Sequence, residues 1–256
     1  MACRLALPLL AFLLLLGGCA TTPDSIIAPD LAGHLHDARP VRLVTPLATI
    51  YQQSRWDDQP VISPDRNSRL AGRIMQALAA SLAKRGWKVA EAPTVSWPEM
   101  EAGSDLAQVT ALPDEPRPRA AIRSLRQLDR MGRQLRLHER IEGVRQAERG
   151  LHPSDTALLG DNAGSLLFAV AVGCDGRLAQ GPCREIQSPP IHDPDFPLGI
   201  LRTLSRGMAL HLYWVDAASG KLLWYDTTRT FNADPDYQPD IATMVNDTLA
   251  EFPPPP

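Results

Sequence analysis

The sequence predicts an α/β protein in which helices pack on a mixed sheet and a C-terminal antiparallel hairpin is followed by a last helix. First, residues 41–90 place one amphipathic helix between two short strand patterns, which is typical of a β-α-β unit. Second, residues 165–173 form a continuous apolar run, as expected of a strand covered on both faces. Third, residues 204–231 carry strand patterns on both sides of a short polar break, which predicts a hairpin.

Composition favours one domain and argues against a polyanionic partner. The chain has 256 residues, of which 44% are hydrophobic, so it can bury one sizeable core, and its 24 prolines predict long loops. We therefore expect a single domain over residues 41–252. The formal net charge is −3, and binding to nucleic acid is not expected.

The first residues have the pattern of an export signal that ends at a lipid attachment site. In residues 1–18 the apolar run is too short for a transmembrane helix, which needs roughly 20 residues. The ending Leu16-Gly17-Gly18-Cys19 resembles the bacterial lipobox, which implies cleavage before Cys19 and diacylation of its thiol. Ala20, the second residue of the mature chain, further implies the outer membrane. Residues 19–40 lack a sustained period and predict a flexible leader.

The first β-α-β unit is expected over residues 41–90. Residues 41–47 predict a strand, and residues 48–62 predict a loop. Ser63 and Pro64 are a typical N-cap and first turn, and apolar residues then recur every fourth position until Lys84. Residues 87–90 predict the second strand, and a right-handed crossover is expected if the two strands are parallel.

The middle of the chain predicts a helical insertion within a long loop region. Residues 119–149 have an apolar stripe and many arginines, flanked by the loop at 92–118. Their basic face could meet anionic lipid or cell-wall polymer, or it could be an ordinary solvated face. Interleaved carboxylates favour the solvated face. A short helix over residues 155–159, capped by Ser154, is expected next.

Two cysteines follow the buried strand at 165–173. Cys174 and Cys183 bracket a loop in a chain expected to be exported, which predicts a disulfide between them. A metal site would need two further ligands, and a nucleophilic cysteine would need a nearby base. Neither is evident in the sequence, and no metal is expected.

The hairpin at 204–231 is the strongest local pattern in the sequence. Asp216 can accept backbone N–H bonds in the turn, and Gly220 can adopt a positive φ without a Cβ clash. If Asp216 pairs with Lys221, the regular register sets His211 opposite Asp226 on one face. Pro239 predicts the start of the last helix, and the prolines at 253–256 predict a frayed, extended tail.

The hairpin turn also carries a family resemblance. The stretch Val215-Asp216-Ala217-Ala218-Ser219-Gly220-Lys221-Leu222-Leu223-Trp224 resembles the turn of outer-membrane lipoproteins related to the curli-secretion lipoprotein and to the activators of penicillin-binding proteins. The resemblance implies a fold similar to the N-terminal domain of the β-propeller protein of the Tol–Pal system. Residues 119–149 depart from a curli-type pore, because no lipid-facing strand would tolerate so many charges.

Two classes of function remain open from the sequence. No G-x-S-x-G, H-E-x-x-H or P-loop motif occurs, so we expect no enzymatic activity and no cofactor. The favoured hypothesis is a lipid-anchored, non-catalytic binding or assembly factor with a protein or cell-wall partner in the envelope. The alternative is a periplasmic hydrolase or ligand-binding domain with a site near His211, Asp226 and the loop at Asp161.

Overall fold

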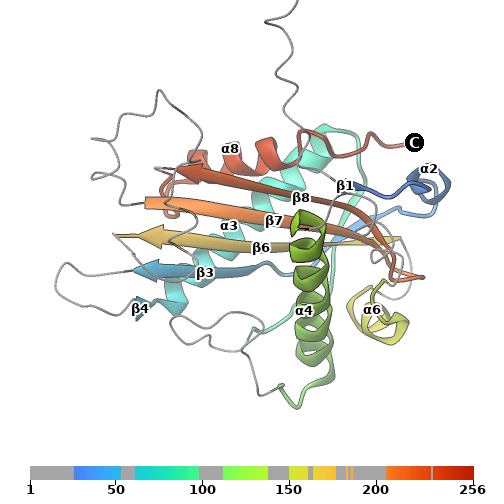
Figure 1. Cartoon of the computed structure of the whole chain (residues 1–256), viewed down its shortest axis with the longest axis horizontal. Coiled ribbons are helices and arrows are strands. Elements are labelled where there is room, and N and C mark those ends of the chain that lie inside the picture. The colour runs from blue at the N-terminus through green and yellow to red at the C-terminus, as the bar shows by residue number, and fades with distance from the viewer. Residues whose placement is uncertain are drawn as a thin grey trace, which may run out of the picture.

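A computed structural model describes residues 26–52, 61–97, 112–137, 150–160, 164–176, 183, 186, 206–231 and 233–256. These residues form three layers, with one mixed sheet between two layers of helices (Figure 1). The predicted α/β class and the C-terminal hairpin followed by a helix are confirmed. The expected lipidation site at Cys19 lies outside the described residues.

The sheet has eight strands and the helical layers contain five described helices. The strands are β1 (Ile26–Ile27), β2 (Val41–Leu43), β3 (Leu47–Gln52), β4 (Val61–Ile62), β5 (Val89–Glu91), β6 (Ser165–Asp175), β7 (Arg206–Asp216) and β8 (Leu222–Phe231). The helices are α2 (Leu31–His34), α3 (Pro64–Lys84), α4 (Pro116–Leu137), α6 (Pro153–Gly160) and α8 (Gln238–Thr248). The strand order is β1-β8-β7-β6-β2-β5, and β3 pairs with both β6 and β4.

Each face of the sheet has its own hydrophobic core. One core joins the sheet to α3 and α8, and its central residues include Leu70, Ile74, Leu78, Trp214, Ile241 and Val245. The other joins the opposite face to α4 and α6 through residues that include Leu125, Leu128, Leu159, Phe168, Tyr213 and Tyr225. Figure 1 shows α4 in front of the strands and α3 behind them. The apolar run at 165–173 is therefore buried on both sides, as its sequence predicts.

The first β-α-β unit forms as predicted. Ser63 is the N-cap residue of α3, Pro64 opens its first turn, and the helix ends at Lys84. β5 runs parallel to β2, with Val41 opposite Val89. Trp87, expected in the strand, instead precedes it, and its buried indole donates to the carbonyl oxygen of Pro253 at 3.0 Å.

The loop predicted over residues 48–62 is wrong in its first part, because β3 occupies Leu47–Gln52. β2 and β3 both pair with β6, but the offset changes by one residue between Leu43, opposite Leu167, and Leu47, opposite Val170. One extra residue is thus accommodated between the two strands, as in a β-bulge. Pro46 lacks an N–H and lies within this interruption. The sequence pattern therefore indicates the end of one strand there and does not indicate the strand that follows.

Residues 26–40 of the predicted flexible leader are instead part of the domain. Ile27 lies opposite Trp224 in an antiparallel pair with β8, and Leu31 is buried in the core beneath α3 and α8. Lys221 Nζ donates to the carboxylate of Asp30, which joins α2 to the hairpin turn. The leader prediction is therefore wrong for residues 26–40.

The predicted frayed C-terminal tail is also wrong. Phe252 is buried, and its ring centroid lies 4.8 Å from that of Trp214 and 4.9 Å from that of Trp224. Arg39 Nη2 donates to the backbone oxygen of Pro256 at 2.8 Å. The tail packs because an aromatic residue precedes the prolines and because its carbonyl groups meet donors from distant segments.

The disulfide and the hairpin turn agree with their predictions. Cys174 and Cys183 are bonded, with their Cα atoms 5.8 Å apart. In the turn, Asp216 Oδ1 accepts the N–H of Ser219 at 2.6 Å, and Gly220 has a φ of 73°. These two residues therefore have the structural roles expected of them.

The described part of the predicted helical insertion is packed by its apolar stripe. Leu125 and Leu128 are buried against the sheet, while Arg119 donates to the carbonyl oxygen of Pro113 at 2.8 Å. The part of the prediction that covers residues 138–149 lies outside the described residues.

Candidate functional site

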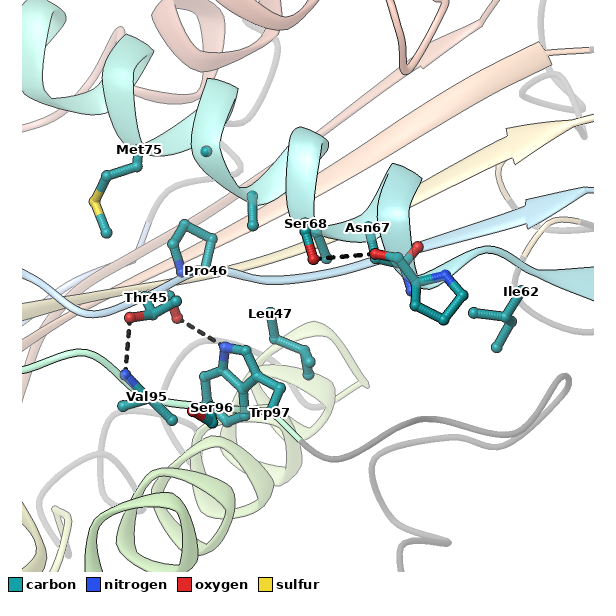
Figure 2. A pocket seen from close by; sticks show the side chains of 14 residues that line it. Thr45, Pro46, Leu47, Ile62, Asn67, Ser68, Met75, Val95, Ser96 and Trp97 are labelled. Carbon is teal, nitrogen blue, oxygen red and sulfur yellow. Dashed lines mark hydrogen bonds between the residues drawn. The ribbon is translucent and has the colours of Figure 1, made fainter.

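The strongest candidate site is a pocket at the interruption between β2 and β3. It has a volume of about 600 Å³, within the range of small-ligand pockets. Three segments form its described walls: residues 45–48, residues 62–75 with the end of β4 and the first turns of α3, and residues 95–97, which follow β5 (Figure 2). We call it the switch-point pocket.

The pocket lies where the chain topology changes sides. β2 and β5 are parallel neighbours. β2 leads through β3 to α3, on one face of the sheet, whereas β5 is followed along the chain by α4, on the other face. In open α/β sheets, ligands bind in the crevice that such a divergence leaves beyond the carboxyl ends of the strands. The pocket occupies this crevice.

Thr45 holds the wall that follows β5. Its hydroxyl accepts the N–H of Val95 at 3.1 Å, and its carbonyl oxygen accepts the indole N–H of Trp97 at 3.1 Å. Figure 2 shows the indole directed toward Thr45. These bonds fix residues 95–97 beside Thr45, where both segments line the pocket.

The helical wall is made by small and neutral residues of α3. Ala71 and Gly72 face the pocket, and a Cβ added to Gly72 would meet no atom within 4 Å. Asn67 Oδ1 accepts the N–H of Ile50 at 2.7 Å, and the hydroxyl of Ser68 donates to the carbonyl oxygen of Pro64 at 3.0 Å. None of the described residues that line it carries an ionisable side chain. The pocket can therefore offer shape, apolar contact and a few neutral hydrogen bonds.

The structure corrects the predicted pairing of His211 with Asp226. Trp214 lies opposite Trp224 and Val215 lies opposite Leu222, so Leu223 is an extra residue in β8. This bulge shifts the register beyond it by one residue. His211 is opposite Thr227, and Asp226 is opposite Leu212. The two predicted partners therefore project from opposite faces of the sheet.

The two side chains face different helical layers. His211 faces the α4 side, where its ring stacks on Tyr225 with a centroid distance of 6.4 Å and its Nδ1 lies 3.3 Å from the tyrosine hydroxyl. Asp226 is 7% exposed and accepts the N–H of Thr227 at 2.6 Å. The loop at Asp161 lies outside the described residues. The structure thus does not bring His211 and Asp226 of the predicted alternative site together.

A second recess, of about 560 Å³, lies between α4 and the start of α6. Arg123 forms two hydrogen bonds with the buried carboxylate of Asp155, and this contact raises the pKa of the guanidinium. His152 Nδ1 lies 2.8 Å from the hydroxyl of Ser154. α6 begins at Pro153, one residue before the predicted cap, so Ser154 belongs to its first turn. These contacts join two helices and stabilise a helix terminus.

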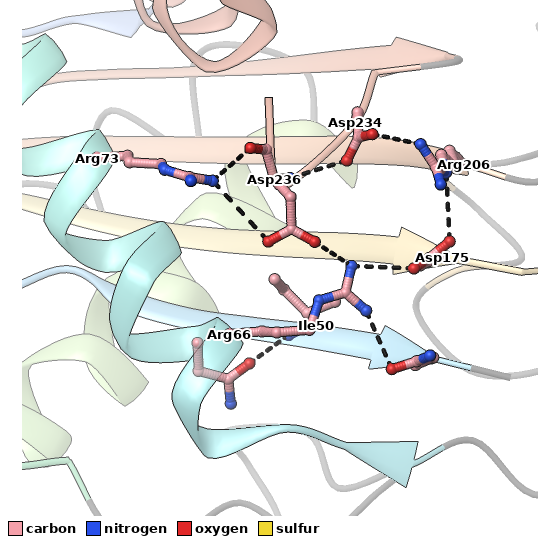
Figure 3. Close-up of polar contacts among 9 residues, drawn as sticks. Ile50, Arg66, Arg73, Asp175, Arg206, Asp234 and Asp236 are labelled. Atoms are coloured by element: carbon pink, nitrogen blue, oxygen red, sulfur yellow. Dashed lines mark hydrogen bonds and ion pairs between the residues drawn. The ribbon is translucent and has the colours of Figure 1, made fainter. Parts of the chain in front are cut away.

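A network of arginines and aspartates ties the start of α3 to the opposite end of the hairpin (Figure 3). Arg66 Nη2 lies 2.9 Å from Asp175 and 2.5 Å from Asp236, and Arg206 bridges Asp175 and Asp234. Burial lowers the pKa of Arg66, but its hydrogen bonds to the two carboxylates outweigh this effect and raise it. The network pairs its charges internally, which is typical of a structural role.

Comparison of the chain with protein-family models, with curated proteins and with solved structures gives no match. In the described part of the chain, no helix is both long enough and apolar enough to cross a membrane. The same residues contain no group of three or more His, Cys, Asp or Glu side chains that could hold a metal ion.

Proposed function

We propose that this protein is a lipid-anchored binding factor on the periplasmic face of the outer membrane, where it serves an envelope complex without catalysing a reaction. The lipobox-like ending at Cys19 supports the anchor, and the switch-point pocket supports binding. The resemblance of the hairpin turn to envelope lipoproteins supports the setting.

The observation that carries the proposal is the position of the pocket relative to the start of the domain. The chain enters the sheet at β1, which is an edge strand. The pocket lies at the other side of the sheet, beside β3, four strand spacings away in the pairing order. At about 4.8 Å per strand this separation is about 19 Å. A domain tethered ahead of β1 would present the pocket away from its anchor.

The chemistry of the pocket favours binding over catalysis. General acid and base catalysis requires a titratable group within hydrogen-bond reach of the substrate. The pocket is lined by Thr, Ser and Asn side chains together with apolar residues. The neutral surface that these described residues form suits recognition of an uncharged ligand. The hydrolase alternative gains no support from the separated His211 and Asp226.

Site-specific cross-linking in cells tests the proposal. A photo-reactive amino acid at Ser96, on the pocket wall, should yield an adduct, whereas one at exposed Thr94 should not. The adduct should be lost when Cys19 is replaced by alanine in a chain exported by a cleavable signal. Cys3→Ala is the matched control, because Cys3 lies in the segment expected to be removed.

Mass spectrometry of the mature N-terminus provides the second measurement. The proposal predicts a diacylated Cys19 as the first residue. An unmodified N-terminus, or equal Ser96 adducts with and without Cys19, would contradict it.

A further inference from the structure

The outer edge of β3 is paired at its C-terminal end but not beside the pocket. β4 pairs with Tyr51 and Gln52, and β5 pairs with β2 at Val41–Leu43. Among the described residues, no strand pairs with the outer side of residues 44–50. The switch-point pocket lies at this gap.

The direction of the peptide groups along β3 can be derived from one hydrogen bond. The N–H of Ile50 donates to the side chain of Asn67, on α3, so this peptide group points away from β6. Peptide groups alternate sides along a strand, and Ala48 therefore shares the outward side of Ile50. The N–H and C=O groups of Leu47 and Thr49 are directed toward β6.

Ala48 consequently presents one donor and one acceptor to the pocket. It lines the pocket and is only 7% exposed. In the described part of the chain, neither its outward N–H nor its carbonyl oxygen has a hydrogen-bond partner. A buried backbone group without a partner costs free energy comparable to a lost hydrogen bond, so a partner that bonds both groups of Ala48 would be stabilised here.

We infer that the switch-point pocket binds a short, uncharged peptide segment in extended conformation, which adds as a strand to the outer edge of β3 at Ala48. The N–H and C=O of one strand residue are the complement of the peptide groups of an adjacent strand, and strand addition to a sheet edge is an established mode of peptide recognition. The inference rests on the proposed function, in which this pocket is the binding site.

The lining residues restrict the side chains of the bound segment. The described lining residues offer no ionisable side chain to pair with a charge, and burying an unpaired charge is costly. Ile62, Met75 and Trp97 instead offer apolar contacts. An acyl chain could make the same apolar contacts, but it would leave the donor and the acceptor of Ala48 unsatisfied. The peptide is therefore the better match.

Nuclear magnetic resonance with the purified domain tests the inference. The probe is N-acetyl-Val-Ala-Val-amide, which is uncharged and favours the extended conformation. Its addition should shift the amide resonance of Ala48 and slow hydrogen exchange there at least tenfold. The same peptide with N-methylated internal amides should bind at least tenfold more weakly, and N-acetyl-Asp-Ala-Asp-amide should not bind.

Proline substitution supplies a matched pair of variants. Ala48→Pro removes the outward N–H, which bonds no described residue, and an edge position of this kind tolerates proline. This variant should remain folded and lose binding of the tripeptide at least tenfold. Thr49→Pro removes an N–H directed toward β6 and should unfold the domain. If Ala48→Pro does not fold, the test is hydrogen exchange at Ala48 in the unaltered protein, which the tripeptide should slow.

Two outcomes would overturn the inference: no change at Ala48 on addition of the tripeptide, or equal binding of the N-methylated peptide. If Ser96 still forms its tether-dependent adduct in cells, these outcomes refute peptide binding but do not contradict the proposed function. An unacylated Cys19 would instead remove the proposed anchor and leave peptide binding intact.

Discussion

The indole N–H of Trp97 donates a hydrogen bond of 3.1 Å to the carbonyl oxygen of Thr45. The same threonine accepts the N–H of Val95 through its hydroxyl. One residue in the interruption between β2 and β3 thus fixes the segment that leaves β5, and the shape of the switch-point pocket depends on it.

Replacing Thr45 by valine should destabilise the protein. The change keeps the shape of the side chain but removes the acceptor of the Val95 N–H, and a partly buried donor without a partner costs about 1–2 kcal/mol. Urea unfolding measures the loss. Thr94→Val, at an exposed position nearby, should change the free energy of unfolding by less than about 0.5 kcal/mol. Equal effects of the two variants would show that Thr45 does not hold this wall.

Gly220→Val should lower the melting temperature strongly. The glycine has a φ of 73°, and a Cβ there would overlap the carbonyl oxygen of Leu151. A β-branched residue adds strain to this overlap, so the expected loss is roughly 3 kcal/mol or more. Gly72→Ala is the control, because a Cβ at Gly72 meets open space and alanine favours the helix. An unchanged melting temperature in Gly220→Val would refute the turn geometry.

The disulfide should contribute to stability in the oxidised protein. Cys174 and Cys183 are separated by 9 residues. Closing a loop of this size lowers the entropy of the unfolded chain enough to stabilise the fold by about 2–3 kcal/mol. The double variant Cys174→Ser/Cys183→Ser should lose that amount in urea unfolding. With Cys19 replaced by serine and the signal removed, thiol labelling of the unfolded, unreduced chain should find no reactive thiol. Two labelled cysteines would contradict the bridge.

The contact of Asp30 with Lys221 should appear in an acid titration. The hydrogen bond from Lys221 lowers the pKa of the Asp30 carboxyl below its ordinary value of 3.8. Because the pKa is lower in the folded state, the stabilisation is present above the unfolded pKa and is lost as the pH falls through the folded one. Lys221→Met should raise the pKa of Asp30 toward 3.8, as measured by nuclear magnetic resonance. Lys84→Met, at the far end of α3, is the control and should leave the pKa of Asp30 unchanged. If Lys221→Met also leaves the pKa of Asp30 unchanged, α2 does not dock on the turn.

Arg66→Met should cost more than a surface substitution on the same helix. It leaves the carboxylates of Asp175 and Asp236 without their shared partner, and the expected loss is roughly 2–3 kcal/mol at neutral pH. Arg69→Met, at an exposed position of α3, should be nearly neutral. Chemical unfolding measures the free energy of unfolding of both variants. A loss of stability below about 0.5 kcal/mol in Arg66→Met would show that solvent replaces the ion pairs of the network.

The sequence predicts elements whose side chains follow one clear period. The fourfold repeat after Pro64 predicts α3, and the turn between Asp216 and Gly220 predicts the hairpin. The register of that hairpin could not be predicted, because Leu222, Leu223 and Trp224 are all apolar where both faces of the sheet are covered. Without alternation, nothing in the sequence marks the extra residue in β8.

The candidate site has a weak signal in the sequence because it consists of neutral residues from three separate segments. Pro46 is the visible mark of the interruption, and Ala71 and Gly72 are the visible small residues on α3. A proline inside a strand pattern and two small residues on a helix each have common structural explanations. Only the fold brings them to the same crevice.

The short ladder of β1 has a mechanical consequence for a tethered domain. Among the described residues, β1 pairs with β8 through Ile26 and Ile27, and the Ala28 N–H adds one bond to the carbonyl oxygen of Leu223. The contact of Asp30 with Lys221 lies just beyond. A pull between the anchor and an occupied pocket would load these few bonds before the longer ladders of β6, β7 and β8. Detachment of residues 26–40 would then lengthen the connection by up to about 50 Å while the rest of the sheet stays paired.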